Sequence, residues 1–126
     1  MTASAADVPL TYHLYDRDSG ETAELFSSRP ELEAYRLAPM QGRSIRARDG
    51  LDLVSYLTLP AGERGARPAR PLPMVLAVHG GPWARDGYGY DAEHQWLANR
   101  GYAVLSVNYR GSSGLGKAFV NAGDLE

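Results

Sequence analysis

Cysteine is absent from this sequence of 126 residues, and neither sign of charge is in large excess. Without thiols the chain forms no disulfide, holds no thiolate-bound metal and has no cysteine nucleophile. That composition fits a reducing compartment, and we expect a cytoplasmic protein. The net charge is only -2 and the pI about 5.9, so electrostatics give no reason to expect a nucleic-acid partner or an anionic membrane.

Long hydrophobic runs are also missing. The longest apolar run is Met74 to Val78, whereas a membrane-spanning helix needs about 20 residues. The N-terminus lacks the basic and apolar regions of a secretory signal. We therefore expect no membrane partner, and with 44% hydrophobic and 22% charged residues the composition is that of a globular domain.

Two hairpins are predicted in the first half of the chain. Residues 12–26 form two half-apolar runs around a turn-rich cluster, and an isolated hairpin of this kind needs something to pack on. Residues 27–42 are predicted to be a linker with one helical turn near 31–35. A second hairpin is expected from strands at 44–48 and 51–59, joined by Asp49-Gly50, a strong tight-turn signal.

The second half changes to a βαβ pattern after a proline-rich loop at 60–73. The expected segments are a buried strand at 73–78, a loop at 79–90, a helix at 91–100, a buried strand at 102–107, a loop at 108–116 and a helix from 117 to 122. Asp91 is expected to cap the first helix and Gly101 to end it, with Trp96 and Leu97 facing the core. The predicted fold class is α/β.

His79-Gly80-Gly81-Pro82 directly follows the first buried strand of this pattern. A glycine pair there lets the backbone approach a ligand and point N–H groups into the crevice at the carboxyl end of the sheet. Donors fixed in this way stabilise the oxyanion of a tetrahedral intermediate, and losing one costs about 3–4 kcal/mol. For this motif alone, a tight turn without chemistry is the alternative interpretation.

The surrounding motifs resemble the prolyl oligopeptidase family, and its acylaminoacyl-peptidase-like branch most closely. They are the HGGP motif, Gln95-Trp96-Leu97-Ala98, Arg100-Gly101-Tyr102 and Asn108-Tyr109-Arg110-Gly111, in this order. The resemblance is strong over residues 72–126 and moderate over 43–59. In that family a β-propeller caps an α/β-hydrolase domain, and peptides are cleaved by acyl transfer to a serine.

The resemblance implies a domain assignment and a site. Residues 1–42 would be a remnant of the last propeller blade, and residues 43–126 the N-terminal part of the hydrolase domain. The N–H of Gly81 would be an oxyanion donor, with Gly80 shaping the turn. His79 would support the loop and would not be the catalytic base. The implied substrate is a peptide, with no cofactor.

No serine lies in the G-x-S-x-G frame of a nucleophile elbow. Ser112 and Ser113 come nearest, but Arg110 and Leu115 stand where the frame requires glycine. The resemblance places the nucleophile, the acid and the base after residue 126. None of the triad is therefore expected in this chain, which we predict to be inactive alone.

The absence of the segment that carries the elbow has a structural consequence. By the resemblance, the strand that carries the elbow would pair beside Met74 to Val78. Without it, this segment becomes an exposed apolar edge that favours self-association or pairing with a complementing C-terminal hydrolase fragment. A non-catalytic interaction module of hydrolase descent is the alternative function.

Residues 111–117 match most of a phosphate-binding P-loop, and Arg110 and Lys117 could bind an anion. Ala118 stands where Ser or Thr would hold Mg²⁺. A glycine-rich loop with sharp turns explains the same residues without a nucleotide, and we favour that interpretation.

The remaining candidates are individual side chains. Trp83 and Arg85 are candidates for a substrate cleft, together with Tyr88 and Tyr90, although packing over the loop would explain the aromatics equally well. Arg85-Asp86 is expected to form a local ion pair or a loop hydrogen bond. The three histidines lack metal-ligand spacing, so no metal site is expected.

The absent elbow gives a direct prediction. A serine-directed fluorophosphonate should not label the isolated chain stoichiometrically, because no side chain is placed as an activated nucleophile. Intact-mass spectrometry checks this, and one adduct per chain would contradict the predicted inactivity.

Overall fold

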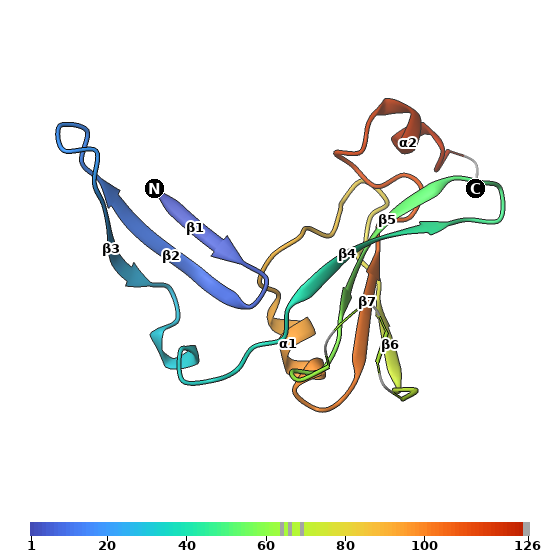
Figure 1. The fold of residues 1–126 in the computed structure, drawn as a ribbon. Coiled ribbons are helices and arrows are strands. Elements are labelled where there is room, and N and C mark those ends of the chain that lie inside the picture. The colour runs from blue at the N-terminus through green and yellow to red at the C-terminus, as the bar shows by residue number, and fades with distance from the viewer. Residues whose placement is uncertain (64, 66, 69, 125–126) are drawn as a thin grey trace.

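The computed structural model describes residues 1–63, 65, 67–68 and 70–124, and over these residues the strands form two sheets (Figure 1). The first sheet has the strand order β1-β2-β3 and the second has the order β4-β5-β7-β6. The strands are β1 (Thr2–Ala5), β2 (Val8–Tyr15), β3 (Thr22–Ser27), β4 (Met40–Arg46), β5 (Asp52–Thr58), β6 (Met74–Ala77) and β7 (Ala103–Val107). The helical elements are the 3₁₀ turn η1 (Pro30–Leu32) and the helices α1 (Ala92–Ala98) and α2 (Lys117–Asn121).

The predicted hairpin at 12–26 is confirmed as the antiparallel pair β2 and β3. Asp16 shapes the turn, because its Oδ1 accepts hydrogen bonds from the N–H of Asp18 at 2.8 Å and of Ser19 at 3.1 Å. Hydrogen bonds from the backbone of Ser19 and then of Asp18 lower the pKa of Asp16 below its ordinary value. The turn predicted from this cluster of residues is therefore stabilised by the carboxylate of Asp16.

Strand β1 was not expected from the sequence. It pairs antiparallel with β2, with Thr2 opposite Tyr12. Its four residues, TASA, show no apolar alternation, so only the pairing reveals it. Leu14, Leu25 and Phe26 are each 57% exposed. The first sheet thus presents apolar side chains to solvent, as expected for a hairpin that needs a further packing partner.

The second hairpin is confirmed, but β4 begins earlier than predicted. It starts at Met40 rather than at Ser44, and the linker is correspondingly shorter. Met40 is buried and lies opposite Thr58 of β5, so cross-strand pairing extends the ladder through a segment that reads as linker. In the turn, Gly50 has φ +92°, a conformation that favours glycine.

The βαβ unit is confirmed. β6 pairs parallel with β7, and α1 lies between them in the chain. Asp91 caps α1 by accepting the N–H of His94 at 2.9 Å, and Gly101 follows the helix with φ +88°. Because β5 pairs antiparallel with β7 on its other side, the second sheet is mixed.

His94 carries the contact between α1 and the sheet. The ring is almost fully buried and bridges Thr58 Oγ1, 2.9 Å from Nδ1, and Ser106 Oγ, 2.7 Å from Nε2. The prediction that Trp96 lies in the core was wrong, since this side chain is 56% exposed. The helix buries His94 and Ala98, four residues apart, so Trp96 lies on the opposite face with Arg100 over its ring.

Gln95 joins the two sheets. Its Oε1 accepts the N–H of Ala38 at 2.8 Å, and its Nε2 donates to the carbonyls of Ala38 at 2.7 Å and of Ala6 at 3.1 Å. Ala6, in the turn between β1 and β2, also packs with Met40 and Tyr56. One amide therefore satisfies three backbone groups from the N-terminal segment.

β6 lies at the edge of the second sheet, as predicted. The expectation that this strand is buried on both faces was wrong, because Met74, Leu76 and Val78 are each more than half exposed. Positions 64, 66 and 69 of the predicted loop 60–73 lie outside the described residues. Within the described ranges, no helix is long and apolar enough to cross a bilayer.

His94 makes stability depend on pH. Burial lowers its pKa, against smaller opposing effects of Asp91, Asp86 and Glu93. Above about pH 6.5 the ring is neutral in both the folded and the unfolded chain. Below that pH the unfolded chain takes up a proton that the folded chain resists, so stability falls.

We predict that His94→Leu flattens this acid-side loss of stability. The variant should also be less stable at pH 8 by about 1–3 kcal/mol for each hydroxyl left without a partner. Urea unfolding of both proteins between pH 5 and pH 8 measures the two effects. An unchanged dependence on pH in the variant would contradict the assignment to His94.

Candidate functional site

Two loops meet at one end of the second sheet. The β6 loop (residues 78–91) and the β7 loop (residues 108–116) follow two adjacent parallel strands, so both loops begin at the carboxyl end of the sheet. The β6 loop contains the HGGP motif, and the β7 loop contains most of the near-P-loop segment. The contacts between these loops define the candidate site.

Gly81 needs to be glycine. Its φ is +146°, and a Cβ there would lie 2.8 Å from the backbone nitrogen of Trp83 and 3.2 Å from that of Ala84. A Cβ added at Gly80, by contrast, would meet no atom within 4 Å. Gly81 is exposed, and its N–H donates no hydrogen bond to another described residue. The loop therefore presents a backbone donor to solvent.

His79, in the β6 loop, is held by residues of the β7 loop. Its ring stacks on Tyr109 with centroids 4.5 Å apart, and Tyr109 Oη donates to the His79 carbonyl at 2.8 Å. Nδ1 lies 2.8 Å from the Gly80 carbonyl. Nε2 lies 3.0 Å from Ser112 Oγ. Both ring nitrogens are engaged, which fits the expected supporting role.

Two serine–histidine pairs were missed from the sequence, because their members are far apart in it. They are Ser112 with His79 and Ser106 with His94. Both serines are buried, and Ser112 Oγ donates its hydrogen to the Tyr109 carbonyl at 2.6 Å. A hydroxyl that a substrate cannot reach is no nucleophile, so neither pair supplies the missing catalytic serine.

Asn108 connects the end of β7 to the β6 loop. Its side chain is fully buried, and its Oδ1 accepts the N–H of Asp86 at 2.8 Å while its Nδ2 donates to the Asp86 carbonyl at 3.3 Å. A second link is the bond from the N–H of Ser113 to the carbonyl of Ala84, at 2.9 Å. The β7 loop thus supports the β6 loop along its length.

Glycines of the β7 loop make room for the β6 loop. Gly111 has φ +91°, and a Cβ there would lie 2.9 Å from Cβ of Pro82. Gly114 has φ +77°, and a Cβ there would lie 2.7 Å from Nη1 of Arg85. Packing against Pro82 therefore requires glycine at position 111, while at position 114 the positive φ favours glycine and the nearby end of Arg85 can move aside. Both observations agree with the turn interpretation of the P-loop-like segment. The helix that follows, α2, has five residues.

The side chains predicted for a cleft lie on the β6 loop. Trp83 is 72% exposed and Tyr88 is 61% exposed, so the predicted packing of Trp83 over the loop is not seen. Tyr88 contacts Tyr56, with ring centroids 6.2 Å apart. Arg85 Nε donates to the Asp86 carbonyl at 3.3 Å, which confirms the loop hydrogen bond predicted for this pair.

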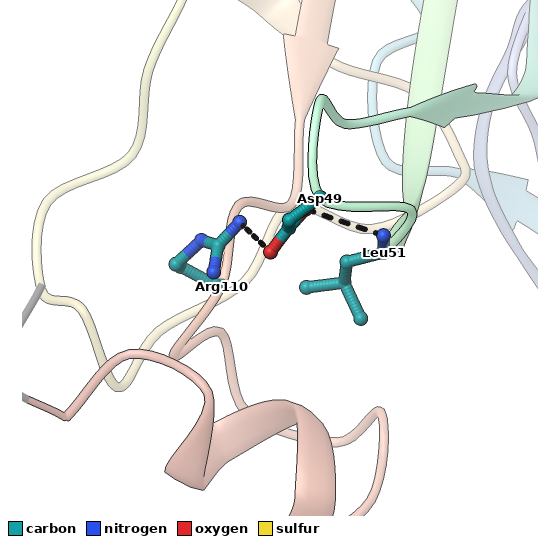
Figure 2. A network of polar contacts seen from close by, with 3 residues as sticks. All are labelled: Asp49, Leu51 and Arg110. Atoms are coloured by element: carbon teal, nitrogen blue, oxygen red, sulfur yellow. Dashed lines mark hydrogen bonds and ion pairs between the residues drawn. The ribbon is translucent and has the colours of Figure 1, made fainter.

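Arg110 ties the β7 loop to the turn between β4 and β5 (Figure 2). Its Nη2 lies 2.6 Å from Oδ2 of Asp49, and Asp49 Oδ1 accepts the N–H of Leu51 at 3.3 Å. The hydrogen bond from Arg110 lowers the pKa of Asp49, helped by that from Leu51. Arg110 therefore has a carboxylate partner within the chain. Among the described residues, no three His, Asp or Glu side chains are grouped to hold a metal ion.

Comparison with known proteins agrees with this arrangement. A model described as the prolyl oligopeptidase family matches residues 88–126. The dipeptidyl aminopeptidase BIII of Pseudoxanthomonas mexicana is 58% identical over 98% of the chain, and the dipeptidyl peptidase family member 6 of Caenorhabditis elegans is 44% identical over 100% of it. The chain belongs to the prolyl oligopeptidase family.

The solved structures support the family assignment. The acylaminoacyl peptidase of Pyrococcus horikoshii is 26% identical and superposes with a TM-score of 0.71 over 94% of the chain. The chain spans only 18% of that protein, and 18% and 19% of the two relatives named above. Prolyl oligopeptidase family proteins are thus matched over a short part of their length, which contains the β6 and β7 loops.

Proposed function

We propose that this chain supplies the oxyanion-binding loop of a serine peptidase. The observation that carries the proposal is the backbone of Gly81, which has φ +146° and an exposed N–H with no acceptor among the described residues. A donor fixed at the carboxyl end of a parallel strand is suited to hold the negative oxygen of a tetrahedral intermediate. Gly80, with open space around it, shapes the turn before that donor.

The proposed reaction is acyl transfer. A serine outside this chain attacks the carbonyl carbon of a peptide, the oxygen becomes negative, and the N–H of Gly81 donates to it. The intermediate expels the amine, and water then releases the acyl group from the serine. The chain alone is inactive in this proposal, because its own serine–histidine pairs are buried.

The domain assignment and compartment belong to the same proposal. Residues 1–42 correspond to a propeller remnant and contain the three-stranded sheet together with the first three residues of β4, and residues 43–126 correspond to the start of the hydrolase domain. The exposed apolar side chains of the first sheet support this division, because further blades would cover them. The absence of cysteine supports a cytoplasmic location.

A chimera tests the proposed function. The 126-residue chain replaces the aligned segment of the P. mexicana dipeptidyl aminopeptidase BIII, and hydrolysis of a dipeptidyl p-nitroanilide is measured. We expect the chimera to turn over. Gly81→Ala should lower kcat by about 10²–10³-fold, because the added Cβ displaces the backbone at Trp83 and so the fixed donor.

Gly87→Ala is the matched control, since Gly87 lies in the same exposed loop and a Cβ there meets nothing within 4 Å. This variant should keep the kcat of the chimera. Turnover by the Gly81→Ala chimera equal to that of Gly87→Ala would refute the oxyanion role of Gly81.

The exposed edge favours an association of the isolated chain. Met74 and Leu76 are exposed on the edge strand β6, and Val78 is exposed directly after it, so the strand is open to a second copy or to a complementing fragment that carries the elbow. This interaction role is the second candidate function.

We predict that the isolated chain elutes above the 13.7 kDa of a monomer. Leu76→Lys should shift it toward the monomer, because a charge on an edge strand opposes pairing. Tyr35→Lys, at an exposed position in the linker, is the control. Light scattering gives the masses, and a monodisperse wild-type monomer would argue against the association.

A further inference from the structure

We propose that Asn108 is a positioning residue that fixes the geometry of the oxyanion donor from the neighbouring strand. The inference rests on the proposed function of the β6 loop and adds a residue to it. Asn108 touches no reacting atom in this proposal. It acts through Asp86, whose backbone N–H and carbonyl both bond to its side chain.

The side chain of Asn108 bonds to both backbone groups of Asp86, as a neighbouring β-strand would, although Asp86 is not in a strand. β6 ends at Ala77, and Asp86 lies nine positions further on, in the irregular β6 loop. The planar amide presents one acceptor and one donor, and these match the N–H and C=O of Asp86. Asp lacks the donor when ionised, Leu lacks both groups, and a Ser or Thr hydroxyl carries its donor and acceptor on one atom, so it cannot face the N–H and the C=O side by side.

Asn108 is itself held rigidly. It directly follows β7, its side chain is fully buried, and its own N–H donates to the carbonyl of Val54 in β5 at 2.9 Å. An amide buried in this way is costly unless it is paired, so the clamp on Asp86 has one satisfied arrangement. The β7 strand therefore sets the position of Asp86.

The segment that contains Gly81 is fixed at both ends. At its start, Tyr109 and Ser112 hold His79, two residues before Gly81. At its end, Asn108 holds Asp86, five residues after Gly81. Between these anchors the Ala84 carbonyl also accepts the N–H of Ser113 at 2.9 Å, and Pro82 packs against Gly111. Removing the Asn108 anchor leaves the Ser113–Ala84 bond on this side of Gly81 and loosens the loop.

Catalysis by a backbone donor depends on such fixing. An oxyanion donor accelerates the reaction because it needs no reorganisation when the charge develops, and a displacement of about 1 Å can cost about 10²-fold in rate. Loosening Asp86 should therefore lower kcat and leave substrate binding nearly unchanged, because Asn108 is buried away from solvent.

The test uses the chimera described above. Asn108→Asp keeps the acceptor and the size of the side chain, but it loses the donor to the Asp86 carbonyl. We expect kcat to fall about 10–100-fold with KM within about twofold of the parent. The number of active sites is counted by fluorophosphonate titration, so that kcat refers only to folded enzyme even where the variant is less stable.

A second variant and two controls separate the possible results. Ser112→Ala loosens the first anchor and should also lower kcat at constant KM, whereas Gly87→Ala should not. If Asn108→Asp keeps the kcat of the parent while Gly81→Ala loses it, the positioning role is wrong and the proposed function stands. If Gly81→Ala keeps its kcat, the proposed function fails, and the role of Asn108 fails with it.

Discussion

The site depends on the parallel pairing of β6 with β7. Val75 lies opposite Val104 and Ala77 opposite Ser106, and this register sends both following loops from the same edge of the sheet. Because β5 runs antiparallel to β7, the turn before β5 lies at that edge as well, where Asp49 meets Arg110 (Figure 2). Three segments that are distant in the sequence are thus brought together by strand order alone.

The fold was predictable where local pattern and tertiary environment agree. The turn around Asp16 and the cap at Asp91 each have a local physical signature. The apolar run of β6 predicted a strand, but its environment is more exposed than the run indicates. β1 and the exposure of Trp96 were not predictable, because a pairing partner decides the first and the choice of helix face decides the second. The buried face of α1 is set by His94, a polar residue that bonds to hydroxyls of β5 and β7 and that a count of apolar positions overlooks.

The candidate site was predictable in its glycines but not in its supports. HGGP follows a strand, and this context is sufficient to predict a loop with exposed backbone donors. The bonds from Asn108 to Asp86 join residues 22 positions apart, and they follow from the strand register rather than from any local pattern. The same holds for Gly111, for which the sequence predicts a turn but does not reveal that Pro82 lies against it.

Gly111 also constrains how the two loops can vary. It leaves room for Pro82 and has φ +91°, so a side chain at position 111 is compatible with this packing only when the residue at position 82 gives way. The two positions are 29 apart in the chain, so a change in the β7 loop requires a compensating change in the β6 loop.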